Sequence, residues 1–126
     1  MIEEPHSRSR FVQSVVYALR GLRYTVVSQR NMVIHVVVSG GAIFLGLWLQ
    51  LSRFEWMYLW ATITLVLVTE TVNTAIEITI DLVTRKRKYR AMLSKDVAAG
   101  AVLLTASHAV IAGYILFFDK LLLKFV

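Results

Sequence analysis

The chain has 126 residues, of which 57% are apolar and 17% are charged, and its formal net charge is +6. This length is room for one small domain, and the mean hydropathy of +0.63 excludes a disordered chain and disfavours a soluble globule. The absence of cysteine from the sequence excludes disulfides, thiolate metal sites and a cysteine nucleophile. A small, basic membrane protein is what remains.

The first segment, at about residues 8–30, is predicted to form an amphipathic surface helix. At about 100° per residue, its apolar side chains between Phe11 and Val26 fall within an arc of about 140°. Arg10 and Tyr17 lie on the opposite side. A basic amphipathic helix is suited to the membrane interface, and a simple anchor attracted to anionic lipid explains this segment equally well.

Three long apolar segments follow, at about residues 31–52, 56–83 and 97–118. A bilayer core of about 30 Å needs about 20 helical residues, so each segment is long enough to cross it. Only helices or closed barrels satisfy the backbone in lipid, and these segments lack the alternation of barrel strands. We therefore expect an all-α membrane protein with three transmembrane helices in one domain over residues 1–126.

The basic residues predict the orientation of these spans. In chain order, the four segments outside the spans carry five, one, six and two of the 14 basic residues. By the positive-inside rule, the N-terminus and the 84–96 loop face the cytoplasm, and the 52–55 turn and the C-terminus face outward. An aromatic belt at the outer end agrees with this, formed by Trp48, Phe54, Trp56, Tyr58 and Trp60.

The second span carries an unusual acidic stripe. Its polar residues Glu70, Asn73, Glu77 and Asp81 share one helical face about 80° wide. Carboxylates inside a span are costly and are functional by default, and three of them on one stripe repel each other. We therefore expect a positively charged group or ion to bind against this face.

The depth of the stripe indicates which molecules would meet it. If the outer boundary lies near Trp56, Glu70 lies about 21 Å into a core of about 30 Å. Glu77 then lies near the inner boundary, and Asp81 lies just beyond it. A lipid hydroxyl would lie beside Glu70, and a water-soluble cosubstrate would lie beside Glu77 and Asp81.

A basic run follows the stripe, with six cations within the eleven residues 85–95. The run suits a polyphosphate, although positive-inside charge and anionic-lipid binding explain it when it is taken alone. Beside the stripe it predicts phosphoryl transfer, in which oxygen ligands hold Mg²⁺, cations stabilise phosphate and a carboxylate accepts a hydroxyl proton. The sequence has no phosphate-loop motif, so a nucleotide site must be built in another way.

At these residues the sequence resembles the prokaryotic integral-membrane diacylglycerol kinase family, and in particular its undecaprenol kinase branch. The resemblance covers roughly residues 8–120. The motifs that carry it are Glu70-x-x-Asn73-Thr-Ala-Ile-Glu77-x-x-x-Asp81, Lys95-Asp96-x-Ala-Ala-Gly-Ala-Val, Arg20-Gly21-Leu22 and Arg30-Asn31-Met32-x-Ile34-His35.

The resemblance implies a homotrimer in a bacterial cell membrane, with active sites between subunits and no nucleic-acid partner. It implies MgATP as the phosphoryl donor and a membrane lipid alcohol, undecaprenol or diacylglycerol, as the acceptor. It implies that Glu70 is the catalytic base and that Glu77 is a metal ligand. The nucleotide-binding residues that it implies are Arg10, Tyr17, Asn73, Glu77, Asp81, Lys95 and Asp96.

The sequence departs from the family at two places. Gln29 stands where the family usually has a glutamate as a second metal ligand. Its amide can still offer a carbonyl oxygen, but the lower negative charge of the site is expected to weaken Mg²⁺ binding. Residues 87–92 replace a histidine and a proline or glycine of the family, so the contacts on the adenine side are not carried over.

Two other functions are compatible with the same sequence features. A degenerate family member acting as a membrane scaffold and a small ion or proton conductor remain as alternatives to a lipid kinase. His35 and His108 have no paired ligands at metal spacing, so we expect interhelical hydrogen bonds from them. Ser94 is expected to cap the third span.

Overall fold

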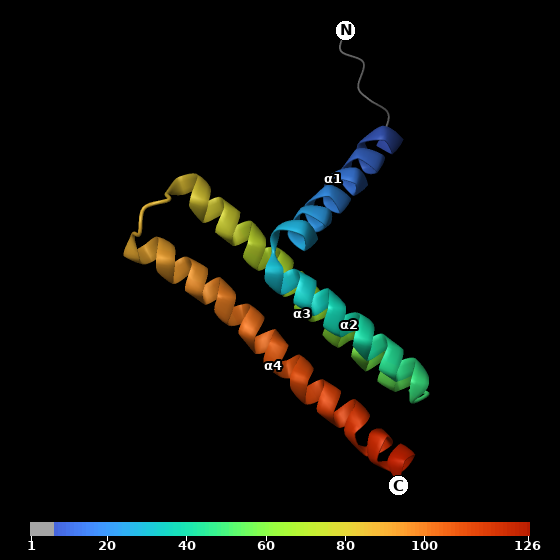
Figure 1. Cartoon of the computed structure of the whole chain (residues 1–126). Coiled ribbons are helices and arrows are strands. Elements are labelled where there is room, and N and C mark those ends of the chain that lie inside the picture. The colour runs from blue at the N-terminus through green and yellow to red at the C-terminus, as the bar shows by residue number, and fades with distance from the viewer. Residues whose placement is uncertain (1–6) are drawn as a thin grey trace.

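A computed structural model describes residues 7–126 of the chain, which form four helices and no strand (Figure 1). The expected all-α architecture is confirmed. The helices are joined by short connections, and the longest of these, residues 84–88, links the last two helices. The four helices are α1 at Ser7–Ser28, α2 at Arg30–Trp48, α3 at Arg53–Val83 and α4 at Tyr89–Phe125.

Helices α2, α3 and α4 are long and apolar enough to cross a membrane. Helix α2 has 19 residues, which is about 28 Å of rise and close to the thickness of a bilayer core. Helices α3 and α4 have 31 and 37 residues, so their ends extend beyond a core of about 30 Å. The three spans predicted from the apolar segments therefore correspond to three real helices.

Helix α4 begins earlier than the apolar segment at 97–118 indicates. It starts at Tyr89, so Ser94 lies inside the helix, where its Oγ donates a hydrogen bond to the backbone oxygen of Arg90 at 2.9 Å. The expectation that Ser94 caps this helix is wrong. The apolar segment marks only the part of a helix that meets lipid. The first two turns of α4 are more polar and lie before that segment, but they belong to the same helix.

The two longest helices form an antiparallel hairpin, with α2 packed along α3 (Figure 1). Helix α1 diverges from this bundle (Figure 1). The chain breaks between α1 and α2 at Gln29, whose φ of −107° and ψ of 113° are extended rather than helical. Most of the apolar face of α1, including Phe11 and Leu19, is therefore exposed in the single chain and free to meet a membrane surface.

The main apolar cluster lies at the end of the bundle where α2 turns into α3. Here Ser52 and Glu55 form a capping box at the start of α3. Glu55 also pairs with Lys120 of α4 at 3.3 Å, which joins the two helices at this end. The buried members of the cluster are Leu49, Leu51, Leu59, Ile63, Leu116 and Phe117.

Gly46 is the glycine of α2 that this packing requires. A Cβ at Gly46 would lie 2.9 Å from Cδ1 of Leu51 and 3.0 Å from Cη2 of Trp56, whereas a Cβ at Gly40 would meet nothing within 4 Å. We expect Gly46→Ala to lower the free energy of unfolding by about 1–3 kcal/mol relative to Gly40→Ala. Thermal unfolding of both variants in one detergent measures this difference, and equal midpoints would contradict it.

Candidate active site

Glu70 is the most deeply buried charged side chain among the described residues. It is 1% exposed, and neither of its carboxylate oxygens has a hydrogen-bond partner. A buried acceptor without a partner costs free energy, and such groups are rare in folded proteins unless they serve a function. The position of Glu70 therefore marks a site.

Glu70 lines a cavity of about 300 Å³ between α2, α3 and α4. Glu77, one of the polar residues of the stripe, lines the same cavity two turns further along α3. Small side chains of α4, Ala99 and Ala106, form part of the opposite wall and leave room for a ligand. The remaining polar residues of the wall are Asn73 of α3 and Asn31 and His35 of α2.

Asn73 links the stripe along the helix. Its Nδ2 donates a hydrogen bond to Oε1 of Glu77 at 3.2 Å. Its Oδ1 is buried and accepts no hydrogen bond. Two residues that line the cavity therefore carry three buried acceptor atoms without a partner, namely Oδ1 of Asn73 and both carboxylate oxygens of Glu70.

The stripe continues to a solvated ion pair. Lys95 Nζ lies 2.5 Å from Oδ1 of Asp81, and the two side chains are 39% and 49% exposed. Asp96 is the next residue of α4 and is exposed. The exposure therefore rises along the stripe, from the buried Glu70 through the partly buried Glu77 to the exposed Asp81. This gradient suits a site that meets lipid at one end and a water-soluble molecule at the other.

Three of the residues expected at the site lie elsewhere in the single chain. Tyr17 lines a different cavity of about 520 Å³ between α1 and α3, and the guanidinium of Arg20 lies 5.6 Å from its ring centroid. Arg10 is exposed on α1, and Gln29 is partly buried at the break before α2. None of these three residues lines the Glu70 cavity.

Two cavity residues were missed from the sequence. The sequence predicts an interhelical hydrogen bond for His35 and assigns no role to Asn31. They are four residues apart and so share one face of α2, which was a usable signal, but only the packing shows that this face meets Glu70. His108, by contrast, packs edge-on against Tyr58 with ring centroids 5.9 Å apart.

Two oxygen-bearing side chains of the cavity have the chemistry of magnesium ligands. Among residues 7–126, no three histidine or acidic side chains converge to hold a metal ion. Mg²⁺ does not need such a cluster, since it usually binds one or two carboxylates and takes its other ligands from phosphate and water. The carboxylate of Glu77 and Oδ1 of Asn73 fit that pattern, because both are oxygen donors on one wall.

Comparison of the sequence with known proteins identifies one family. The profile of the family described as "Prokaryotic diacylglycerol kinase" matches residues 16–117. The chain is 38% identical over 113 residues to an undecaprenol kinase of Bacillus subtilis, covering 90% of this chain and 92% of that protein. It is also 38% identical over 107 residues to a diacylglycerol kinase of a Synechocystis species, covering 84% of this chain and 61% of that longer protein.

The ion pair between Asp81 and Lys95 is expected to add little to stability. Exposed pairs contribute about 0–1 kcal/mol, because water screens them and the side chains lose freedom. We therefore expect Asp81→Asn to lower the free energy of unfolding by less than about 1 kcal/mol. Denaturation of the solubilised protein measures this value. A loss well above that range would show that the pair is structural.

Proposed function

The chain belongs to the prokaryotic diacylglycerol kinase family of membrane lipid kinases, and from this premise we propose that it transfers the γ-phosphoryl group of ATP to the hydroxyl of a membrane lipid alcohol. The single observation that carries the proposal is the buried, unpartnered carboxylate of Glu70 in a cavity within an apolar helix bundle. The proposed acceptor is undecaprenol or diacylglycerol, the two lipids in the names of the relatives.

In the proposed reaction, the lipid hydroxyl oxygen attacks the γ-phosphorus while the bond from that phosphorus to the bridging oxygen of ADP breaks. The hydroxyl proton passes to the carboxylate of Glu70, whose two oxygens accept no other hydrogen bond. His35 lines the same cavity and is a candidate donor of a ring N–H that would hold this carboxylate in place.

The nucleotide is proposed to bind at the exposed end of the stripe. The ammonium group of Lys95 can exchange its contact with Asp81 for one with a phosphate, because this ion pair is exposed and weak. Asp96 and Asp81 are proposed to contact the nucleotide, as the resemblance implies. Their place at the solvated end of α3 and α4 supports this, since ATP reaches the protein from water.

Mg²⁺ is proposed as the cofactor, held by Glu77 with Asn73 beside it. When bound, the ion would neutralise charge on the phosphate oxygens and orient them. Gln29 is the proposed second ligand, and two features make it a weak one. It is neutral, and in the single chain it lies at the helix break outside the cavity wall.

We propose that the working unit is a homotrimer with sites between subunits. The division of the expected site residues supports this, because Arg10 and Tyr17 do not line the Glu70 cavity of their own chain. A neighbouring subunit can supply residues that one chain does not bring together. The N-terminus and the connection between α3 and α4 are proposed to face the cytoplasm, since most of the basic residues lie there.

Glu70→Gln tests the proposed base. We expect it to lower the rate of lipid phosphorylation by about 10²–10⁴-fold, because the amide cannot accept the proton. Glu55→Gln is the matched control, since it makes the same chemical change at the other end of α3, and it should retain the rate. The measurement is the transfer of label from γ-labelled ATP to lipid in vesicles. Full activity in Glu70→Gln would remove the base assignment.

Gln29→Glu tests the proposed weak metal ligand. The substitution adds a carboxylate at the position where the family usually has one, so we expect higher activity than wild type at limiting Mg²⁺ and similar activity at saturating Mg²⁺. Initial rates across a magnesium titration measure this. Lower activity at limiting Mg²⁺ would contradict it. If Gln29→Glu and wild type both bind ATP without any turnover, the scaffold alternative is favoured.

A further inference from the structure

Thr74 lies on the side of α3 that faces α1, next to the turn that carries Glu70 but outside the Glu70 cavity. It is 2% exposed and is, with Glu70, among the most deeply buried side chains that the structure describes. Its Oγ1 donates a hydrogen bond to the backbone oxygen of Glu70 at 2.9 Å. In a regular helix the backbone N–H of residue 74 bonds to the same oxygen, so Thr74 contacts it twice. The proposed reaction assigns no role to Thr74.

The backbone at residue 70 has an unusually large influence on the position of the Glu70 carboxylate. Neither carboxylate oxygen has a hydrogen-bond partner, so no hydrogen bond among the described residues holds the group in place. Its position is therefore set by the backbone turn from which it extends and by the packing around it. Misplacement of a reacting group by about 1 Å can lower a rate by about 10²-fold. A side chain that fixes this turn therefore affects the proposed base directly.

The hydroxyl of Thr74 is placed to fix that turn. A threonine that bonds back to the carbonyl four residues earlier often bends its helix. Other threonines of α3 make the same kind of bond, such as Thr62 to the backbone oxygen of Tyr58 at 2.9 Å, but that of Thr74 ends on Glu70. A methyl group cannot take the place of this hydroxyl without a shift, because close contacts between carbon and oxygen are about 3.3 Å or longer.

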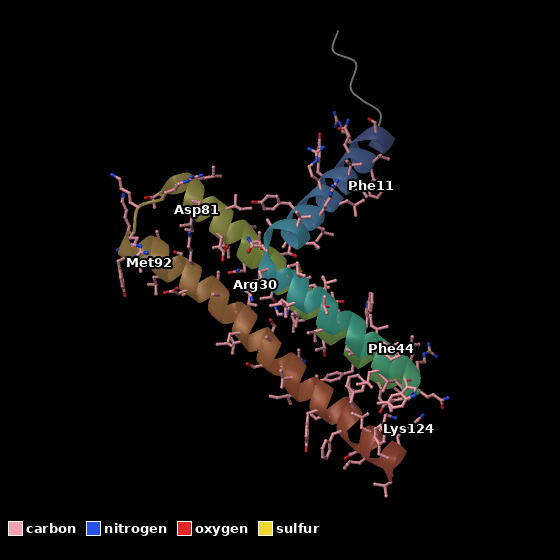
Figure 2. All side chains as sticks on the ribbon, viewed as in Figure 1. Phe11, Arg30, Phe44, Asp81, Met92 and Lys124 are labelled. Carbon is pink, nitrogen blue, oxygen red and sulfur yellow. The ribbon has the colours of Figure 1, made fainter. Side chains whose placement is uncertain are left out.

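Helix α1 covers the other side of Thr74. Thr25 of α1 lines the cavity of about 520 Å³ that Thr74 also lines, and it is the only buried residue among residues 9–28. Figure 2 shows α1 leaving the bundle at its junction near Arg30, with Phe11 near its other end clear of the remaining helices. Helix α1 is therefore attached to the bundle at one end only, and Thr74 lies between this attachment and the turn of Glu70.

We propose that Thr74 is a positioning residue for Glu70, which acts through the backbone oxygen of residue 70 and not through contact with a substrate. This inference rests on the proposed role of Glu70 as the base. Because Thr74 does not line the Glu70 cavity, its loss changes where the carboxylate lies and not which groups bind the nucleotide. The expected consequence is a slower transfer step with unchanged binding of ATP.

The test replaces the hydroxyl and uses a matched threonine as its control. Thr74→Val removes the hydroxyl at nearly constant size, and Thr74→Ser keeps it. Thr62→Val is the control, because Thr62 is 5% exposed and makes the same bond at the same distance on the same helix. It lies about 18 Å along α3 from Thr74.

Two measurements are made on each full-length protein in lipid vesicles. The first is lipid phosphorylation, which gives kcat per nucleotide-binding site and KM for ATP. The second is the rate at which dicyclohexylcarbodiimide, an apolar reagent for carboxyl groups, labels Glu70, followed by mass spectrometry. The labelling reports the surroundings of Glu70 and needs no kinase activity.

We expect Thr74→Val to lower kcat by about tenfold or more, with KM for ATP within about twofold of wild type. We also expect it to raise the labelling rate, because a displaced carboxylate is less well covered. Thr74→Ser and Thr62→Val should stay close to wild type in both measurements. Wild-type kcat in Thr74→Val, or an equal loss in Thr62→Val or in Thr74→Ser, would overturn the inference.

Failure of the proposed function gives a different result. In that case none of the four proteins phosphorylates lipid, and the labelling alone decides whether Thr74 positions the carboxylate. Faster labelling of Glu70 in Thr74→Val than in Thr62→Val would then support the positioning role. The same labelling rate in wild type and Thr74→Val would overturn it.

Discussion

The candidate site depends on one costly feature, a carboxylate held inside an apolar helix bundle. Glu70 is 1% exposed and has no hydrogen-bond partner, although carboxylates are normally exposed or paired. The surroundings leave room for it, because α4 contributes small side chains and α2 contributes the polar Asn31 and His35. A packed apolar residue at this position would cost less free energy than a buried carboxylate, so stability alone does not explain Glu70.

The two ends of the bundle have different roles around this feature. The end near the turn from α2 to α3 is closed by the apolar cluster, by the capping box of Ser52 and by the pair of Glu55 with Lys120. The other end is polar and cationic, and its ion pair of Asp81 with Lys95 is solvated. One end therefore fixes the helices, while the other remains available for charged ligands.

Much of this arrangement is predictable from the sequence, for a physical reason. The spacing of Glu70, Asn73 and Glu77 places them on one face of any regular helix, so the stripe does not depend on how the helices pack. Contacts between helices are different. His35 meets the cavity because α2 packs along α3, and hydropathy indicated neither this contact nor the first two turns of α4, which are helical without being apolar. The sequence pattern likewise does not indicate that Arg10 and Tyr17 lie outside the Glu70 cavity of their own chain.

Phosphorylation of lipid by the wild-type protein decides whether this cavity performs the proposed reaction. Purified protein in vesicles containing undecaprenol or diacylglycerol would be given γ-labelled ATP and Mg²⁺, and the lipid and aqueous fractions would then be separated. We expect labelled lipid phosphate to form in step with ADP, with a preference for one of the two lipids. Release of the label as inorganic phosphate, or no consumption of ATP with either lipid, would contradict the assignment of this protein as an active lipid kinase.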